Sequence, residues 1–460
     1  MEKSRRIKSQ SLPAKRGNHF YAFVSGDDVA EHSIPLRAAW QIESAAGELG
    51  WRVGEALGSE GEMRGKFGVG RDALREAIRI VESRGVMQVR RGRAGGLVVA
   101  QPELERAAEA FATYHDLCGY SAEQIDRSVV ALDQMLLKLA AKKPLPHRDS
   151  QTGIRKWLAD ACGEAVLQLY VATLGFLPHV VFDELAGSRD VLELEMAIRG
   201  AIERRDEQML LSLASKLPPE RIPVAGHDGP VKWRRRANAK IIAAKMLGKA
   251  RSKSDCALGN EADLCETFNV SRGLVRQALR ILADLDMLQV KRGRGGGYLI
   301  KDPSPIGIIR QSFPFLAARQ SSPAELTNLM WELNSANLRA AAAGLSRLSA
   351  NLRLAALHDL ELLIRQSEEP ERFIVLQQAL SKIADCPLLD TFARCIVSYQ
   401  ARLTISLRFE EPTPAIQSDF QGRQLAIIDA LRAGDVDVAD SELRVLQDRM
   451  LELLCFLEEE

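Results

Sequence analysis

Residues 258–300 read LGNEADLCETFNVSRGLVRQALRILADLDMLQVKRGRGGGYLI, and this stretch decides the fold that we expect for the chain. It recurs at residues 57–99 as LGSEGEMRGKFGVGRDALREAIRIVESRGVMQVRRGRAGGLVV, without a gap and at a constant offset of 201 positions. The same offset continues past the glycines, where it places Leu132 on Leu333. The sequence therefore predicts an internal duplication whose unit is larger than one motif.

Each copy has the signals of two consecutive helices. In the first, Ser59 is a suitable cap for a short helix through Lys66, and Gly68 suits a tight turn before a longer helix over 71–84. In the second, Asn260 is the corresponding cap. The longer helix carries apolar residues at helical spacing, which we expect to face a core. They are Leu74, Ala77, Ile78 and Val81 in the first copy, and Leu274, Ala278 and Ile281 in the second.

Two short segments with strand character follow the helices in each copy. They are residues 86–90 and 97–100 in the first copy, and residues 287–291 and 297–300 in the second. The turns between them are rich in glycine and arginine, which predicts a β-hairpin. Two helices followed by a hairpin indicate a winged helix-turn-helix.

A row of arginines lies on the outer face of the longer helix in each copy. An exposed guanidinium can donate two parallel hydrogen bonds to guanine in the major groove, and other arginines can neutralise phosphates. Glycines beside the arginines of the hairpin allow its backbone to approach the DNA closely. The predicted DNA-binding residues are Arg71, Asp72, Arg75, Arg79, Arg91, Gly92, Arg93, Asn260, Ser271, Arg272, Gly273, Arg276, Arg280, Lys291, Arg292, Gly293 and Arg294.

The distribution of charge agrees with this interpretation, although the whole chain is nearly neutral, with 62 basic and 61 acidic residues. Residues 231–301 hold 16 basic and 6 acidic residues, and residues 34–100 hold 11 and 8. Positive charge is therefore concentrated on the two copies, as in a nucleic-acid-binding protein with additional acidic domains.

Composition excludes several other classes of protein. Of the 460 residues, 46% are hydrophobic, which suits globular cores rather than disorder. The seven cysteines form no CxxC pair, which disfavours a disulfide scaffold and a zinc finger. Residues 165–182 are apolar enough to resemble a membrane span, but polar interruptions and Pro178 favour a buried helix. We expect a reduced, cytoplasmic protein without a membrane segment.

The copies resemble the GntR superfamily of bacterial transcription regulators, and in particular its FadR-like branch. The resemblance rests on the Ser-Glu cap, the Val-Ser-Arg turn, the Val-Arg-x-Ala-Leu helix and the Gly-Arg-Gly wing of the quoted stretches. It implies DNA contact by Arg71, Arg75, Arg272 and Arg276, and by Gly92 and Gly293 at the wing tips. Where the family usually has an arginine after the cap's glutamate, this chain has Gly61 and Ala262.

The region after each copy resembles the effector-binding domain of that family, an antiparallel helical bundle. Many relatives hold a divalent metal there with an Asp and three histidines. The positions of the first two histidines are occupied here by Arg155 and Glu195, and by Gln377 and Gln424; the third falls near Leu446 or Gln447. An arginine that often accompanies the site is replaced by Val129 and Met330. We therefore expect no bound metal and no cofactor.

The predicted fold is mainly α, with two winged helix-turn-helix modules of three helices plus a hairpin each, and two all-α bundles related by a pseudo-two-fold repeat. The expected divisions are a basic arm at 1–33, the first winged module at 34–101, the first helical domain at 102–216, a linker at 217–231, the second winged module at 232–302 and the second helical domain at 303–460.

The predicted function is sequence-specific binding of double-stranded DNA in transcription regulation, by one chain that mimics a dimer. A small-molecule effector is a further expected partner, and dimerisation of the chain to give four modules is the competing arrangement. An alternative function is a protein-interaction or assembly module whose winged helices are vestigial. An enzyme is disfavoured because the sequence has no nucleophile triad, phosphate loop or carboxylate pair.

Overall fold

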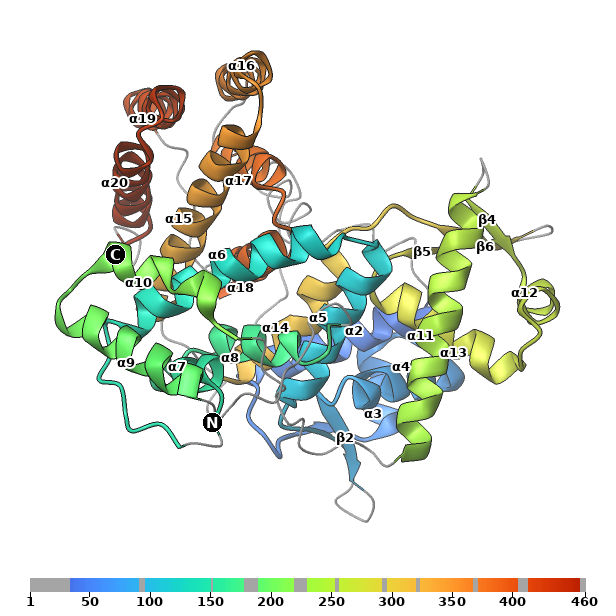
Figure 1. The fold of residues 1–460 in the computed structure, drawn as a ribbon. Coiled ribbons are helices and arrows are strands. Elements are labelled where there is room, and N and C mark those ends of the chain that lie inside the picture. Colours follow the sequence, from blue (N-terminus) through green and yellow to red (C-terminus); the bar gives the residue numbers. More distant parts are fainter. Residues whose placement is uncertain are drawn as a thin grey trace, which may run out of the picture.

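The structure, a computed structural model, is mainly helical with small antiparallel sheets (Figure 1). It describes residues 34–90, 96–149, 152–177, 189–218, 230–252, 256–291, 296–319, 323–366, 371–403 and 413–455.

Helices and strands alternate in the first described segment. Its elements are α2 (Ile34–Glu48), β1 (Ala56–Gly58), α3 (Glu60–Phe67), α4 (Arg71–Ser83), β2 (Met87–Arg90) and β3 (Gly96–Val99). The three strands form one antiparallel sheet in the order β1-β3-β2, with Met87 opposite Val99. Helices α2 and α4 pack against each other and bury an apolar core between them.

The same order of elements occurs between Pro230 and Ile300. The elements are α11 (Pro230–Arg251), β4 (Ala257–Gly259), α12 (Glu261–Phe268), α13 (Arg272–Asp284), β5 (Leu288–Lys291) and β6 (Gly297–Ile300). The sheet order is β4-β6-β5, and α11 packs on α13 as α2 packs on α4. We refer to residues 34–99 as module 1 and to residues 230–300 as module 2.

Side-chain caps define the short helices. The Ser59 hydroxyl accepts a hydrogen bond from the Glu62 amide at 3.3 Å, and the Glu62 carboxylate accepts one from the Ser59 amide at 2.7 Å. Asn260 and Asp263 make the same reciprocal pair at the start of α12. Gly68 ends α3 in the left-handed conformation, with φ of 62°, which costs least for glycine. These local interactions explain why the predicted helix limits agree with the structure within one or two residues.

Two details of the modules differ from the sequence prediction. The edge strands β1 and β4 were not predicted, because three residues ending in glycine give no alternating pattern. On α13 the buried residues are Val275, Ala278, Leu279 and Leu282, whereas the expected Leu274 and Ile281 are only half-buried. In α4, Leu74, Ala77 and Val81 are buried as expected, and Ile78 is half-buried.

The chain between the modules forms a first bundle of helices. Its elements are α5 (Leu104–Cys118), α6 (Ala122–Ala140), α7 (Ile154–Cys162), α8 (Ala165–Leu174), α9 (Arg189–Glu203), α10 (Glu207–Ser212) and the 3-10 turn η2 (Ala214–Lys216). Helix α8 is short and almost completely buried, packed on α5 and α7. It accounts for the first ten residues of the apolar stretch that resembled a membrane span.

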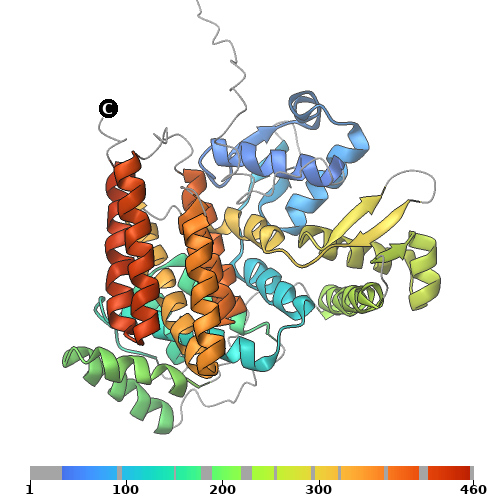
Figure 2. The ribbon, with the colours of Figure 1, turned by 90° about the horizontal axis from the view of Figure 1, so that it is seen from above.

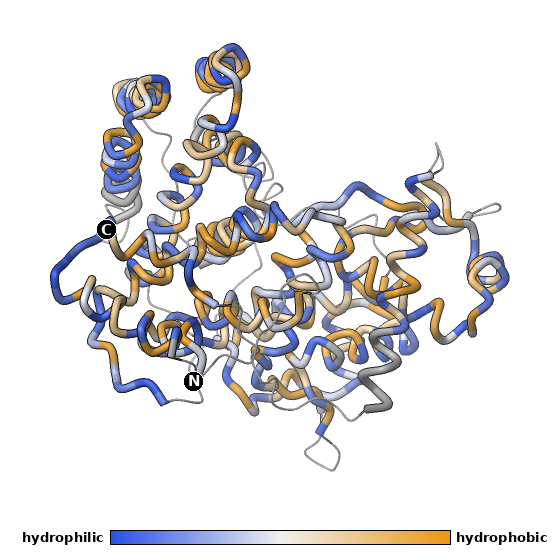
Figure 3. Tube along the Cα trace, in the orientation of Figure 1, coloured by the Kyte–Doolittle hydropathy of each residue, from blue (hydrophilic) through white to orange (hydrophobic). Residues whose placement is uncertain are grey.

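A second bundle follows module 2. Its elements are α14 (Ile306–Ala318), α15 (Pro323–Arg347), α16 (Ala350–Gln366), α17 (Glu371–Ala384), α18 (Pro387–Leu403), α19 (Pro414–Ala433) and α20 (Val436–Cys455). Figure 3 shows hydrophobic and hydrophilic residues interspersed along the helices. Within the described segments, every helix is too short or too polar to cross a bilayer.

The two bundles pack against each other through equivalent helices. Helix α6 contacts α15 and α18, and α5 contacts α14 (Figure 2). At the centre, the ring of Phe392 stacks on Phe111 with centroids 4.6 Å apart and meets Tyr170 edge-on at 6.1 Å. Each bundle also contacts the opposite module, because α14 packs on α2 and α5 packs on α11.

Candidate nucleic-acid interface

The outer face of α4 presents two arginines that a glutamate from the preceding helix holds. Arg71 and Arg75 keep 62% and 48% of their side-chain surface exposed. The Nε of Arg71 donates to Oε1 of Glu60 at 3.2 Å, and the Nε of Arg75 lies 3.4 Å from the same oxygen. Because Glu60 is the first residue of α3, it fixes the arginine row relative to both helices.

Module 2 repeats this arrangement with a stronger pair. The Nε of Arg276 lies 3.0 Å from both carboxylate oxygens of Glu261, and the Nε of Arg272 lies 3.9 Å from one of them. Both arginines are more than 60% exposed. The hydrogen bonds with Glu261 raise the pKa of Arg276, whose guanidinium is therefore charged.

Glu60 and Glu261 were not predicted as part of the site. Their signals in the sequence are identity at the offset of 201, at the first position of each short helix, and the glutamate of the resembled cap. Their carboxylates hold the guanidinium groups in place and lower the net positive charge of the face.

The outermost arginines, Arg79 and Arg280, differ between the modules. Arg79 is well exposed and pairs with Glu76 of its own helix at 3.2 Å. Arg280 donates instead to Glu76 of the other module and is only half-exposed. The structure thus places Arg280 at the contact between α4 and α13, and the two helices meet through their later turns.

The other predicted residues within the described segments lie at the expected surface. Asn260 and Ser271 act as helix caps, and the Ser271 hydroxyl accepts from the Leu274 amide at 3.4 Å. Asp72 and Gly273 are exposed in the first turns of α4 and α13, and Lys291 is exposed at the end of β5. The predicted wing-tip residues Arg91, Gly92, Arg93, Arg292, Gly293 and Arg294 lie outside the described residues.

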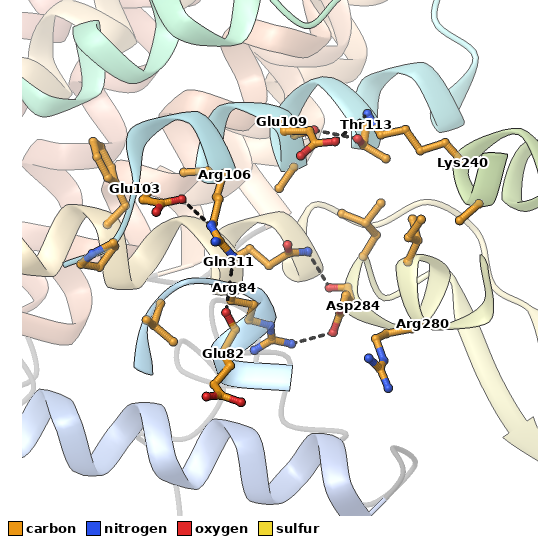
Figure 4. A pocket seen from close by; sticks show the side chains of 18 of the residues that line it. Glu82, Arg84, Glu103, Arg106, Glu109, Thr113, Lys240, Arg280, Asp284 and Gln311 are labelled. Carbon is orange, nitrogen blue, oxygen red and sulfur yellow. Dashed lines mark hydrogen bonds and ion pairs between the residues drawn. The ribbon is translucent and has the colours of Figure 1, made fainter. Parts of the chain in front are cut away.

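A buried arginine joins the two modules (Figure 4). Arg84, at the end of α4, donates to Glu43 of α2 at 2.7 Å and to Asp284 of α13 at 2.8 Å, and its side chain is 6% exposed. Burial alone would lower the pKa of Arg84, but the two carboxylates raise it above its ordinary value. Arg84 therefore stays charged within this buried junction.

Beside this junction lies a cavity of about 600 Å³ between the modules and helices α5, α11 and α14. Its lining carries equal numbers of acidic and basic groups, which Figure 4 shows in close-up. The acidic members are Glu82, Glu103, Glu109 and Asp284, and the basic members are Arg84, Arg106, Lys240 and Arg280.

Comparison with known proteins identifies one part of this interface. Residues 251–296 match the family described as bacterial regulatory proteins, gntR family. Module 2 contains a gntR-type helix-turn-helix. The matched residues include both α12 and α13, with the pair formed by Arg276 and Glu261.

Two individual proteins are similar over parts of the chain. RmpR of Mycobacterium gastri, named as an HTH-type transcriptional regulator, is 51% identical over 55 residues. That segment is 12% of this chain and 20% of RmpR, so the chain spans about a fifth of this relative's length. The solved structure of Streptococcus agalactiae GntR aligns over 47% of this chain and 98% of its own, with 20% identity and a TM-score of 0.33.

In the first bundle, ion-paired side chains occupy the two positions where the resembled family has metal-binding histidines. Arg155 makes a bidentate pair with Asp133 at 2.9 and 2.7 Å, and Tyr170 donates to the same carboxylate at 2.8 Å. Glu195 accepts from Arg148 at 2.9 Å. Partial burial would raise the pKa of Glu195, but its arginine partners lower it below the ordinary value. These side chains satisfy one another and do not fit a metal ion.

In the second bundle the corresponding positions hold amides. Gln424 is completely buried, Gln447 is buried and Gln377 is half-buried. Across the described residues, no three His, Cys, Asp or Glu side chains are grouped as metal ligands. Neutral amides without a carboxylate lack the charge that retains a divalent cation, so this set does not fit a metal either.

The histidines considered as a displaced site are scattered. His115 is buried, and its Nδ1 lies 2.8 Å from the Phe111 carbonyl oxygen. Burial lowers the pKa of His115, which keeps the ring neutral. His147 and His358 are exposed on separate elements, and His179 lies outside the described residues.

Proposed function

We propose that this chain is a sequence-specific DNA-binding regulator of transcription. The proposal rests chiefly on one observation, the exposed pair Arg272 and Arg276 on α13, which Glu261 holds within a gntR-type helix-turn-helix. An oriented guanidinium on an exposed helix suits bidentate contact with guanine in the major groove. The corresponding pair Arg71 and Arg75, held by Glu60, would make module 1 a second DNA-binding unit.

In this proposal a single chain acts as a pseudo-dimer. The buried contacts of Arg84 with Glu43 and Asp284 support a fixed orientation of the modules, since exposure of either partner would cost an ion pair. Covalent linkage also removes the dependence of dimerisation on concentration and allows the modules to diverge. We expect an imperfect palindrome with unequal half-sites as the operator.

A small molecule bound in a helical bundle would modulate this activity. The bundles contact the opposite modules through α14 on α2 and α5 on α11, so a change within a bundle can alter the relative placement of the recognition helices.

Selection of bound sequences from a random duplex pool, followed by fluorescence anisotropy, tests DNA binding. We expect affinity for the selected duplex to fall steeply with salt, because phosphate contacts release counterions. Arg272→Ala and Arg276→Ala should weaken binding, whereas Arg365→Ala on the distant helix α16 removes the same charge and should not. Salt-independent binding, or equal effects of all three substitutions, would exclude the proposed interface.

Mass measurement of the complex with a short selected duplex tests the pseudo-dimer. We expect one chain per duplex and an asymmetric selected sequence. Two chains per minimal duplex, or a strictly symmetric sequence, would favour the competing arrangement with four modules.

A further inference from the structure

Helix α16 exposes more large apolar side chains than any other helix in the described segments. Leu352, Leu354, Leu362 and Leu363 keep between 40% and 60% of their surface exposed. They are four of the twelve large apolar residues exposed there, and no other described helix has more than two. Single exposed leucines are ordinary, whereas several on one helix indicate a contact surface.

Three of these leucines lie on one side of the helix. Leu352, Leu362 and Leu363 fall at i, i+10 and i+11, and the exposed Ala355 falls at i+3. At about 3.6 residues per turn, these four positions lie within an arc of roughly 100°. We call the four residues the leucine stripe.

The opposite side of α16 packs on the second bundle. Its buried residues are Leu357, Leu360 and Ile364, and the helix contacts α17 and α19. Figure 1 and Figure 2 show α16 in the outermost layer of that bundle, at the end remote from both modules. A partner on the leucine stripe therefore leaves the arginine rows of α4 and α13 accessible.

Within the described segments each chain presents one leucine stripe. Helix α16 lies between α15 and α17, whereas the described residues between α6 and α7, 141–149 and 152–153, are not helical. A single self-complementary patch closes into a pair of chains, whereas a second patch would continue into larger assemblies.

The stripe is self-complementary about a two-fold axis. The exposed His358 and Asp359 lie near the middle of α16, with leucines on both sides. In an antiparallel pair of α16 helices, Leu352 of one copy lies against Leu362 and Leu363 of the other. Asp359 of each copy then lies beside His358 of the other. A parallel pair would instead set Asp359 against Asp359, and facing like charges are unfavourable.

The size of this contact makes the pair of chains weak. Helix α16 has 17 residues, so it is about 25 Å long. One such helix against another buries less than the roughly 1,200 Å² of a stable interface. We expect a dissociation constant of about 10 μM, in the range of transient contacts.

We propose that two chains pair through an antiparallel contact of their leucine stripes, and that the pair holds two DNA duplexes together. The contact between chains is independent of DNA binding, and the joining of two duplexes rests on the proposed function. Each duplex is still bound by one chain, because the stripe lies far from the recognition helices.

Sedimentation equilibrium of the full chain without DNA tests the contact. We expect the mass of one chain at about 0.1 μM and a mass approaching two chains at about 100 μM. Leu362→Glu and Leu352→Glu should each weaken the pair at least about tenfold, because they place a carboxylate in an apolar contact.

Leu192→Glu is the matched control. Leu192 lies on α9 of the first bundle and is 48% exposed, which is similar to Leu362 at 40%. The control adds the same charge at the same kind of position and should leave the pair unchanged. All three variants should keep the Tm of the unchanged chain, since none of the three leucines is buried.

Disulfide cross-linking tests the orientation. In the antiparallel pair, the two copies of residue 352 lie about 15 Å apart along the helices, and so do the two copies of residue 362. A disulfide needs Cα atoms within about 7 Å. Copper-phenanthroline oxidation should therefore cross-link a mixture of Leu352→Cys and Leu362→Cys chains more than either variant alone. The unchanged chain gives the background from the natural cysteines.

Capture of a second duplex tests the link to DNA. The selected duplex is immobilised, and the chain is added at about 10 μM with the same duplex carrying a dye. We expect the labelled duplex to be retained, and Leu362→Glu to reduce its retention at least about tenfold. The same variant should bind a single duplex with unchanged affinity.

Three results would overturn the inference. The first is the mass of one chain at every concentration, which is also the result expected if a segment of the same chain covers the stripe. The second is a pair that Leu192→Glu weakens as much as Leu362→Glu does. The third is cross-linking of either cysteine variant alone as efficient as that of the mixture. A chain that binds the selected duplex but never pairs contradicts this inference alone, and a chain that pairs but binds no DNA contradicts the proposed function alone.

Discussion

The two bundles bury different polar groups between corresponding pairs of helices. Helix α7 packs on α6 in the first bundle as α17 packs on α15 in the second. Between the first pair, Arg155 forms a buried ion pair with Asp133. Between the second pair, the Asn337 side chain donates to the backbone carbonyl of Gln377 at 3.2 Å, and Asn334 occupies the position of Asp133 at the repeat offset of 201.

The difference shows that a buried ion pair and a buried amide have different requirements for partners. An ion pair in a core must be complete, since a single unpaired charge is very costly, and the two charges together leave nothing for a ligand to satisfy. Amides carry no net charge, so a buried amide with an incomplete set of hydrogen bonds costs less than an unpaired buried charge. The first bundle is therefore closed by a complete ion pair, whereas the second keeps buried amide atoms without partners.

The largest effect that would sharpen this comparison is the loss of Arg155. Arg155→Met leaves Asp133 buried without its partner and should lower the free energy of unfolding by about 3–5 kcal/mol. Gln377→Met, at the corresponding place, should change it by less than about 1 kcal/mol. Urea denaturation of both variants measures the difference. Similar losses in the two bundles would refute the contrast.

A second prediction concerns the junction of the modules. Arg84→Leu introduces the residue found at position 285, and it leaves the Glu43 and Asp284 carboxylates without their buried partner. We expect a loss of about 3 kcal/mol in urea denaturation, at the low end for a broken buried pair. Arg106→Leu, whose partner Glu103 is mostly exposed, should cost under about 1 kcal/mol. A harmless Arg84→Leu would show that the modules are not locked together.

The recognition helices allow a comparison of the modules by affinity for DNA. Arg272→Ala or Arg276→Ala should weaken specific binding by about 1–3 kcal/mol, and more than Arg71→Ala or Arg75→Ala. The reason is that module 2 has the Ser271 cap, which Gly70 cannot provide, and the greater local positive charge. Anisotropy titrations of the four variants test the order. Negligible effects of all four would remove the arginine rows from the interface.

The smallest effect is expected from chelation. Because neither bundle has a ligand set that fits a metal, EDTA should leave Tm and DNA affinity unchanged. Elemental analysis of the purified protein should find zinc, manganese and nickel well below one equivalent. One equivalent per bundle, lost on substitution of His115, His147, His179 or His358, would contradict this prediction.

The sequence by itself determined the local structure of the modules. Ser59 and Asn260 cap their helices through residues three positions away, and Gly68 supplies the turn that the backbone requires. Such interactions are complete within a few residues, so a pattern of capping and periodicity is enough to place the helices. The exposed arginines followed from the same periodicity.

The tertiary structure decided which side chain each of these groups pairs with. Arg280 was expected at the DNA, yet it pairs with Glu76, about 200 residues away. Arg84 likewise meets Asp284, which lies 200 residues away in the sequence. Periodicity along one helix shows which face is buried but not which side chain lies opposite. The bridges between the modules and the buried ion pair of the first bundle therefore depend on how distant helices pack, because a buried polar group needs a partner that the local sequence does not specify.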